Sequence, residues 1–324
     1  MSGCAVVGPG RRTVRAVLVV GAGSIGSSWA AHLLAHGLEV VVVDPVEASH
    51  ASARRTVESY LAEGGLDGAD LEEALSRLST TTDLVAAAGR ADLVVEAGPE
   101  VLSVKREIFA ELDAATPADV LLTSSSSGIA PSSFADAAVR HPERVLVAHP
   151  FNPPHIVPLV ELVGATSTSP EALAAAGAFF TGVGKRCITL HTELPGHVVN
   201  RLQAALWREA YDLVGRGAVT VADIDTAIAW GPGLRWALLG PFATQHLSGG
   251  DGGIAHILDH LGPPMEEWWQ DLGAPELSPE LVARIVRGMD EAMAGVGQTE
   301  DQLRARRDAA LRALVAAKEE VGLP

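Results

Sequence analysis

The sequence predicts an α/β fold in which a doubly wound, mainly parallel sheet is followed by an all-α C-terminal domain. In the first part of the chain, short β-branched runs alternate with longer segments of helical periodicity, which is typical of βαβ units. After Pro195 and Gly196 the strand signals stop, and apolar residues recur at helical spacing. A chain of 324 residues also exceeds the usual size of one domain. We therefore expect two domains of different class.

Each expected element follows from its own pattern. The expected strands are short apolar runs at residues 17–20, 40–43, 93–96, 120–124 and 145–148. The expected helices between them cover residues 27–36, 48–63 and 104–112, and the last carries Val104, Ile108, Phe109 and Leu112 on one face. In the C-terminal domain, helical spacing covers residues 197–214, 221–230, 253–261 and 281–294.

The change of composition near residues 194–196 predicts the domain boundary, because proline and glycine there would end an element. We expect a first domain at residues 14–195 and a helical domain at residues 196–324. Residues 1–13 are rich in glycine and lack periodicity, so we expect a flexible N-terminal extension. Gly21 interrupts the apolar run after five residues, which argues against a signal peptide or a membrane span.

Charge and cysteine content restrict the class of partner. A net charge of -16 and an isoelectric point near 5.1 disfavour nucleic acid and anionic membranes as partners. Cys187 lies in a further expected strand, far from Cys4, and the two do not form a pattern that suggests a disulfide framework, so we expect a reducing cytoplasm. No metal site is predicted. These features favour an enzyme that acts on a small molecule.

A glycine-rich fingerprint lies between an expected strand and an expected helix. Gly21 would permit a tight turn, Gly23 would let the backbone approach a pyrophosphate, and Gly26 would allow the helix to pack closely on the strand. Ser24 and Ile25 complete this loop at the helix N-terminus, where anions bind. The sequence therefore predicts a Rossmann-type dinucleotide site.

Asp44 follows the second expected strand, eighteen positions beyond Gly26. A carboxylate at this place accepts hydrogen bonds from the ribose hydroxyls, which favours NAD over NADP. The alternative is that Asp44, which precedes Pro45, serves only as a turn residue. FAD is less favoured because no other flavin-type segment is present.

A candidate acid/base pair follows in the stretch from His149 to Glu161. If residues 145–149 and 159–163 run antiparallel around a proline-rich turn near His155, His149 lies opposite Glu161. A carboxylate on one imidazole nitrogen fixes the tautomer and leaves the other nitrogen free to move a proton. We interpret the other histidines considered, His32, His36, His141, His191 and His246, as structural.

Together these segments resemble the 3-hydroxyacyl-CoA dehydrogenase superfamily from about residue 14 to the C-terminus. The resemblance rests on the fingerprint, on residues 94–97, 124–129, 149–161 and 196–201, and on Gly240-Pro241. The chain looks most similar to the branch that contains L-gulonate 3-dehydrogenase (lambda-crystallin) and carnitine 3-dehydrogenase. The resemblance implies a NAD-linked hydride transfer.

The resemblance also implies roles for single residues. His149 would be the general acid/base and Glu161 its orienting partner, while Ser127 and Asn200 would bind at the reacting oxygen and the nicotinamide. Glu100 and Lys105 match positions on the cofactor side. Because four serines stand in a row at 124–127, Ser126 remains an alternative to Ser127. Any of these serines, or Asn200, could instead cap a helix.

Arg235 and Trp236 form the unusual segment of the second domain. A guanidinium between aromatic residues could clamp a substrate carboxylate, and the gulonate and carnitine branch has a similar triplet. We therefore prefer a free-acid substrate, with a structural ion pair of Arg235 as the alternative. Most of the tryptophans also lie in this domain, where they suit the core, a homodimer interface or a bulky aromatic substrate.

Four functions are compatible with the sequence. The leading hypothesis is NAD(H)-dependent interconversion of a 3-hydroxy carboxylate and its 3-oxo acid. The alternatives are a ketoreductase of an aromatic, pyran-forming polyketide pathway, a 3-hydroxyacyl-CoA dehydrogenase, and a non-catalytic crystallin-like or NAD-sensing protein. The sequence leaves the direction of the reaction and the stereochemistry at C3 undecided.

Overall fold

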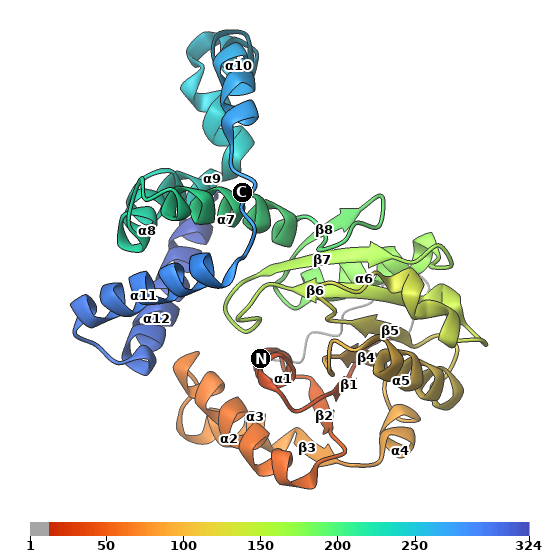
Figure 1. Ribbon diagram of the computed structural model, residues 1–324. Coiled ribbons are helices and arrows are strands. Elements are labelled where there is room, and N and C mark those ends of the chain that lie inside the picture. Colours follow the sequence, from red (N-terminus) through yellow and green to blue (C-terminus); the bar gives the residue numbers. More distant parts are fainter. Residues whose placement is uncertain (1–12, 324) are drawn as a thin grey trace. The chain divides into compact units, whose positions relative to one another are not determined.

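The computed structural model describes residues 13–323 of the chain (Figure 1). Apart from Thr13, the predicted N-terminal extension lies outside the described residues. The chain divides into two compact units, Met1–Arg201 and Leu202–Pro324. The first unit contains the sheet and the second is helical.

The first unit is built on one eight-stranded sheet with the order β3-β2-β1-β4-β5-β6-β7-β8. Its strands are Ala16–Val20, Glu39–Val43, Leu78–Thr81, Leu93–Glu96, Leu121–Ser124, Val145–Pro150, Leu159–Gly164 and Arg186–Leu190 (β1 to β8). All neighbouring strands pair in parallel except β6 and β7, which are antiparallel. The sequence order reverses at β1, which pairs with both β2 and β4. This arrangement confirms the predicted doubly wound sheet.

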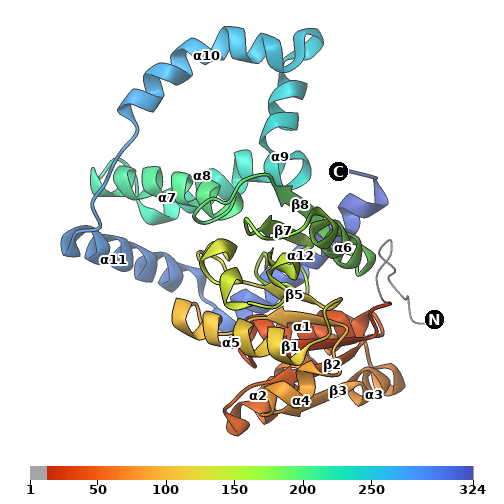
Figure 2. The same ribbon diagram turned by 90° about the vertical axis from the view of Figure 1, so that its right-hand side faces the viewer.

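Helices cover both faces of the sheet (Figure 1, Figure 2). The helices of this unit are Ser24–Ala35, Glu47–Glu63, Gly68–Ser76, Leu84–Ala88, Leu102–Ala115 and Pro170–Gly182 (α1 to α6), with short 3-10 turns at Pro131–Ser133, Ala135–Ala137 and Pro142–Arg144. Val17 and Val19 of β1 belong to one buried cluster, which includes Trp29 of α1. Leu18 and Val20 belong to the other buried cluster, on the side of α4 and α5. The alternation of side chains along the strand therefore feeds two separate cores.

Four strands and helices of this unit, β3, α3, α4 and α6, were not among those expected from the sequence. The strand β3 has only four residues and a single buried side chain, Leu78, so its hydrophobic signal is weak. The helices α3 and α4 have only 9 and 5 residues. The helix α6 is rich in alanine, so it shows little alternation of polar and apolar residues. The strand predicted around Cys187 is confirmed as β8.

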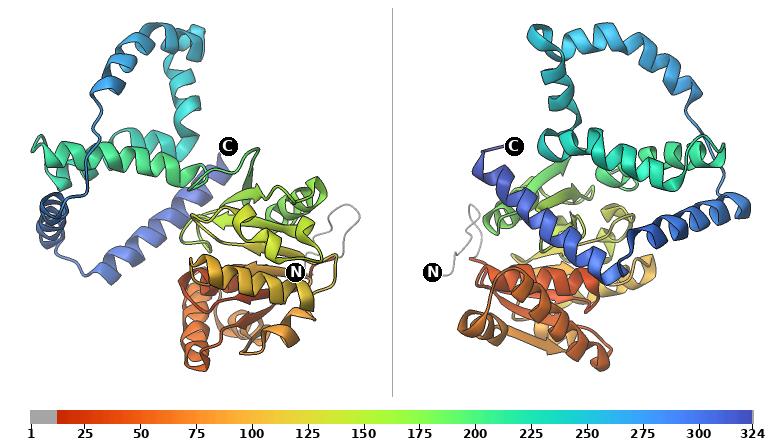
Figure 3. Two further views of the ribbon diagram at one scale, coloured as in Figure 1. Left: turned by 45° about the vertical axis from the view of Figure 1, so that its right-hand side comes forward. Right: turned by 90° about the vertical axis from the view of Figure 1, so that its left-hand side faces the viewer.

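The second unit consists of helices, which confirms the predicted all-α C-terminal region. They are Val199–Gly215, which begins at the end of the first unit, Val221–Trp230, Pro232–Ser248, Gly253–Asp271, Pro279–Val296 and Glu300–Glu320 (α7 to α12), with a short 3-10 turn at Gly250–Gly252. The helix α8 packs on α9 and α11, and α9 packs on α10 (Figure 3). The helices α9 and α12 were not expected. The helix α9 contains Pro241 and is kinked at Gly240, where φ is 75°, and α12 is strongly polar.

Burial differs sharply between the helices of the second unit and the sheet. Large apolar side chains of these helices are exposed, among them Trp230 (78%), Trp268 (61%) and Trp269 (61%). Val214 is the only large apolar side chain that is buried among the described residues of this unit. None of the described helices is long and apolar enough to cross a membrane.

Candidate active site

The two residues of the predicted acid/base pair lie on neighbouring strands. β6 and β7 are antiparallel, and His149 is paired with Glu161 in their register, as the sequence predicted. The Nδ1 atom of His149 lies 2.8 Å from Oε2 of Glu161. Both side chains are buried. The hairpin thus places a histidine and a carboxylate in direct contact.

Both carboxylate oxygens of Glu161 accept hydrogen bonds, Oε2 from His149 and Oε1 from the backbone. Its Oε1 accepts the backbone N–H groups of Val198 at 2.8 Å and of Val199 at 3.1 Å. Burial raises the pKa of Glu161, but the hydrogen bonds from His149 and these amides outweigh it and lower that pKa. Because the carboxylate only accepts, Nδ1 of His149 carries the proton and Nε2 of a neutral ring is left as an acceptor.

The four consecutive serines have four different partners. Ser124 donates to Glu96, Ser125 accepts from Nε1 of Trp29, Ser126 donates to Glu100, and Ser127 lies 3.1 Å from Nε2 of His149. Ser127 is therefore the serine whose hydroxyl meets His149, whereas Ser126 faces away from it toward Glu100. Of the two serines that the sequence offered as partners of His149, the geometry therefore favours Ser127 over Ser126.

Asn200 is the second residue of α7, and its side chain reaches the same serine loop. Its Nδ2 donates to the backbone oxygen of Ser127 at 3.2 Å. The first unit thus brings His149, Glu161, Ser127 and Asn200 into one connected group.

Glu100 and Lys105 lie on the other side of the serine loop. Glu100 accepts the N–H groups of Gly128 at 2.8 Å and of Ile129 at 3.1 Å. Burial raises the pKa of Glu100, but hydrogen bonds, first that of Ser126, outweigh it and lower that pKa. Glu100 is therefore an anion that organises the loop at neutral pH.

Lys105 is 1% exposed and lies beneath this loop. Its ammonium is 3.0 Å from both carboxylate oxygens of the buried Glu96 and 3.4 Å from Glu100. Its position favours a contribution through Glu100 rather than a direct contact with a ligand. Glu96 links Lys105 to Ser124 of the serine loop, and it was not among the site residues expected from the sequence. A charged residue at the end of an apolar strand could have indicated this role.

The glycine fingerprint forms the turn from β1 into α1. Gly21 has a φ of 109°, and a Cβ on Gly26 would lie 1.9 Å from the backbone oxygen of Gly21. Nothing lies within 4 Å of where a Cβ of Gly23 would be, and no side chain caps the helix there. Ser24 and Ile25 form the first turn of α1. This open helix N-terminus fits a dinucleotide pyrophosphate.

Asp44 lies directly after β2 and beside the fingerprint. Its carboxylate accepts the N–H of Ala22 at 2.9 Å and of Val46 at 2.9 Å. Burial raises the pKa of Asp44, but the bonds from these amides and from Ser49 outweigh it and lower that pKa. The bond to Val46 is a turn contact, so Asp44 shapes the turn while it places a negative charge next to the cofactor loop. A charged carboxylate there disfavours the additional phosphate of NADP.

Arg235 and Trp236 belong to the helical unit and are not part of this group of side chains. Both are exposed on α9. Arg235 lines a cavity of 210 Å³ together with apolar residues such as Leu238 and Leu247. No ion pair of Arg235 is found among residues 13–323.

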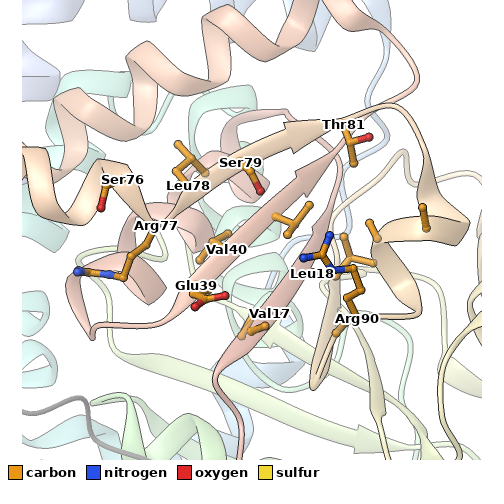
Figure 4. A pocket seen from close by; sticks show the side chains of 15 residues that line it. Val17, Leu18, Glu39, Val40, Ser76, Arg77, Leu78, Ser79, Thr81 and Arg90 are labelled. Carbon is orange, nitrogen blue, oxygen red and sulfur yellow. The ribbon is translucent and has the colours of Figure 1, made fainter.

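A second cavity, of 560 Å³, lies at the opposite end of the first strands (Figure 4). It is lined by the beginning of β1 and β2, by β3 and by α4, with Glu39, Arg77 and Arg90 at its wall. It contains none of the predicted site residues. In doubly wound sheets ligands bind at the carboxyl ends of the strands, so this cavity is not the candidate active site. Among residues 13–323, no group of three or more His, Cys, Asp and Glu side chains is arranged to hold a metal ion.

Comparison with known proteins places this geometry in a family. Residues 16–193 match the 3-hydroxyacyl-CoA dehydrogenase NAD binding domain, and residues 196–284 match the C-terminal domain of the same enzymes. The chain belongs to the 3-hydroxyacyl-CoA dehydrogenase family. Its cofactor is NAD, and the family is one of NAD-dependent dehydrogenases.

Similar sequences and structures agree with this placement. The chain is 47% identical to an L-carnitine dehydrogenase of Streptomyces coelicolor, over 87% of this chain and 88% of the relative. It is 46% identical to an L-carnitine dehydrogenase of Nocardiopsis dassonvillei, over 95% of this chain and 93% of the relative. The solved structure of 5-formyl-3-hydroxy-2-methylpyridine 4-carboxylic acid 5-dehydrogenase, an NAD+-dependent dismutase, matches with a TM-score of 0.78 at 28% identity, over 95% of this chain and 99% of that one.

Proposed function

We propose that this dehydrogenase oxidises a free 3-hydroxy carboxylate to its 3-oxo acid with NAD and catalyses the reverse reduction, and that His149 moves the proton. The single observation that carries this proposal is the double contact of His149, with Glu161 on Nδ1 and Ser127 on Nε2. A neutral imidazole with one nitrogen fixed by a carboxylate is a suitable base for an alcohol.

In the oxidation, Nε2 of His149 takes the proton of the substrate hydroxyl. The imidazolium that forms is stabilised by Glu161, which two backbone amides keep in place. NAD held at the glycine fingerprint would supply the acceptor for the hydride that leaves the substrate carbon. In the reverse direction the imidazolium returns the proton to the carbonyl oxygen. Oxidation needs a neutral His149 and reduction needs a protonated one.

Ser127 and Asn200 would orient the reacting groups. The hydroxyl of Ser127 already contacts Nε2 of His149 and can turn toward the substrate oxygen. Asn200 fixes the backbone of Ser127 and, on the family resemblance, faces the nicotinamide. We assign cofactor binding to Gly21, Gly23, Ser24, Ile25, Gly26, Asp44 and Glu100, with Lys105 acting through Glu100.

For the substrate, L-carnitine is the first candidate because both relatives named above are L-carnitine dehydrogenases. Carnitine is a 3-hydroxy carboxylate with a free carboxyl group. Arg235, which has no ion pair among the described residues, would clamp that carboxylate, with Trp236 beside it. A CoA thioester lacks the free carboxylate, so the clamp distinguishes the two substrate classes.

The test is a substrate panel measured with purified protein. NADH formation is followed with L-carnitine, L-gulonate, 3-hydroxybutyrate and 3-hydroxybutyryl-CoA, and NADH oxidation with an aromatic polyketide β-keto acid. We expect turnover of a free acid. Arg235→Gln should raise KM for that acid by about tenfold, the loss of one charge-assisted contact, and leave KM for NAD unchanged.

Arg216→Gln is the matched control, because Arg216 is an exposed arginine of the same unit that pairs with Asp212. Preference for the CoA ester, or an unchanged KM for the free acid in Arg235→Gln, would contradict the proposal that Arg235 binds the substrate carboxylate. Turnover of the polyketide acid alone would favour the ketoreductase. Binding of NADH without turnover of any substrate would favour the sensor or crystallin-like role.

The two domains are proposed to have separate roles. We propose that residues 14–195 bind NAD and that residues 196–324 bind substrate and form a homodimer. The exposed tryptophans and leucines of α9 and α10 support an assembly that covers them. A cytoplasmic location is proposed because the reaction draws on the cellular NAD pool.

A further inference from the structure

His197 occupies a strained turn immediately before α7. Its φ is 53°, and it is the only residue other than glycine with a positive φ among residues 13–323. Residues other than glycine rarely adopt this conformation, and such strain persists where the surrounding structure requires it. The side chain is 1% exposed, so the turn also buries a polar ring.

The ring of His197 has a defined tautomer. Nε2 lies 3.1 Å from the backbone oxygen of Ser126, which can only accept, so Nε2 carries the hydrogen. Nδ1 is buried and has no hydrogen-bond partner among the described residues. Burial lowers the pKa of His197, and the charge of a protonated His149 lowers it further, although the bond to Ser126 opposes both. The ring is therefore neutral.

The backbone that follows His197 binds the carboxylate of the acid/base pair. The N–H groups of Val198 and Val199 both donate to Oε1 of Glu161. The centroid of the His197 ring lies 5.2 Å from that of His149. One tripeptide thus holds the serine loop with a side chain and the carboxylate of the pair with its backbone.

We propose that His197 is a positioning residue that holds Ser127 against His149 by fixing the carbonyl of Ser126, while its turn presents two amides to Glu161. The inference rests on the proposed function of His149. Without this turn, the strand hairpin would still pair His149 with Glu161, and Asn200 would still bond the backbone of Ser127. The bond to Ser126 and the two amide bonds to Glu161 would be lost.

Burial and the charge of a protonated His149 disfavour a proton on His197, and they outweigh the carboxylates of Glu161 and Glu100, which favour one. The charged or titratable groups that act on it are His149 from β6, Glu161 from β7 and Glu100 from the loop after β4. During reduction His149 is an imidazolium, and a second cation 5.2 Å away would be strongly disfavoured. A protonated His197 would also bury a second N–H without an acceptor, which costs further free energy.

The first experiment compares two substitutions. His197→Phe keeps a ring but removes the donor, and we expect kcat to fall by about tenfold because Ser127 is misplaced. KM for NAD should stay within about twofold, since the fingerprint is untouched. His197→Asn retains an N–H donor and tolerates a positive φ, so it should recover part of kcat. Equal losses in both variants would contradict a role of the donor.

A double-mutant cycle separates positioning from general destabilisation. If His197 acts through Ser127, His197→Phe should lower kcat by less than about twofold when Ser127 is already alanine. The control is His32→Phe, because Nε2 of His32 also bonds a backbone oxygen, that of Val183, at 2.7 Å. Its effect should multiply with that of Ser127→Ala. Multiplying losses for His197→Phe would overturn the proposal.

A measurement without turnover keeps the inference separate from the proposed function. Nitrogen NMR of histidine-labelled protein should show His197 as a neutral ring with the hydrogen on Nε2 throughout pH 6 to 9, a range on either side of the ordinary histidine pKa of about 6.5. The ring signals of His149 should shift in His197→Phe and stay in place in His32→Phe. An Nδ1–H or charged His197, or unchanged His149 signals, would overturn the inference. Normal NMR behaviour without turnover of any substrate would instead reject the proposed function.

Discussion

The sheet unit and the helical unit differ in how much of their apolar surface they bury. In the sheet unit, two clusters of aliphatic and aromatic side chains fill both faces, and every proposed catalytic side chain has a partner within the unit. In the helical unit, tryptophans and leucines are exposed on most helices. Under the proposed function, the proton transfer is carried by the sheet unit alone, and we propose that substrate choice and assembly depend on the exposed apolar surface of the helical unit.

The largest expected effect tests whether the sheet unit carries the chemistry. His149→Ala should lower kcat by roughly 10² to 10⁴-fold, the range for a lost general acid/base. The affinity for NAD should not change, because the fingerprint lies on β1 and α1. Steady-state rates and NADH fluorescence titration measure the two quantities. A variant with a normal rate would move the proton-transfer group elsewhere.

The next effect concerns the orientation of the histidine. In Glu161→Gln, one accepting oxygen becomes an NH2 group that only donates, so the side chain can no longer accept both from His149 and from the amides of Val198 and Val199. We expect kcat to fall on the order of 10²-fold, with the fold retained. Circular dichroism with steady-state kinetics checks this, and a rate like that of the wild type would exclude Glu161 from the mechanism.

The third prediction addresses the helical unit. Replacing Trp268 and Trp269 together by aspartate should convert a dimer into a monomer, because both side chains are 61% exposed and adjacent on α10. Val139→Asp is the control, since Val139 is 83% exposed but lies in the sheet unit. Light scattering after size exclusion gives the mass. A wild-type protein that is already monomeric would contradict the proposed assembly.

The smallest expected effect is a dependence of stability on pH within the sheet unit. Lys185 is buried, and burial lowers its pKa to about 7, whereas an unfolded lysine has a pKa of about 10.4. Between these values the unfolded chain binds a proton that the folded one does not, so stability should rise with pH through this window. Below it, the cost of burying the charge is present in full.

Lys185→Met should remove this rise, and Lys318→Met in the helical unit should retain it. Melting temperatures from pH 7 to about 10 would show the difference. An equal slope in wild type and Lys185→Met would mean that the lysine keeps its proton throughout the window.

The parts predicted from the sequence were those with local signals. The parallel strands, the fingerprint and the pairing of His149 with Glu161 follow from short apolar runs and from one hairpin, and the structure confirms these elements. The missed helices α3, α4, α6, α9 and α12 are short, alanine-rich, kinked or strongly polar, so each lacks a long apolar stripe. The separate partners of the serines, and the contacts of Glu96 and His197, join positions far apart in the chain and leave no periodic trace.

The most direct test of hydride transfer from a 3-hydroxy carboxylate uses L-carnitine that carries deuterium at C3. We expect the protein to form NADH in which that deuterium has moved to the nicotinamide ring, as mass spectrometry of the isolated cofactor would show. Reduced cofactor without deuterium would contradict direct transfer from C3. Absence of reduction of NAD by every free 3-hydroxy acid of the panel, while NAD still binds, would contradict the proposed substrate class.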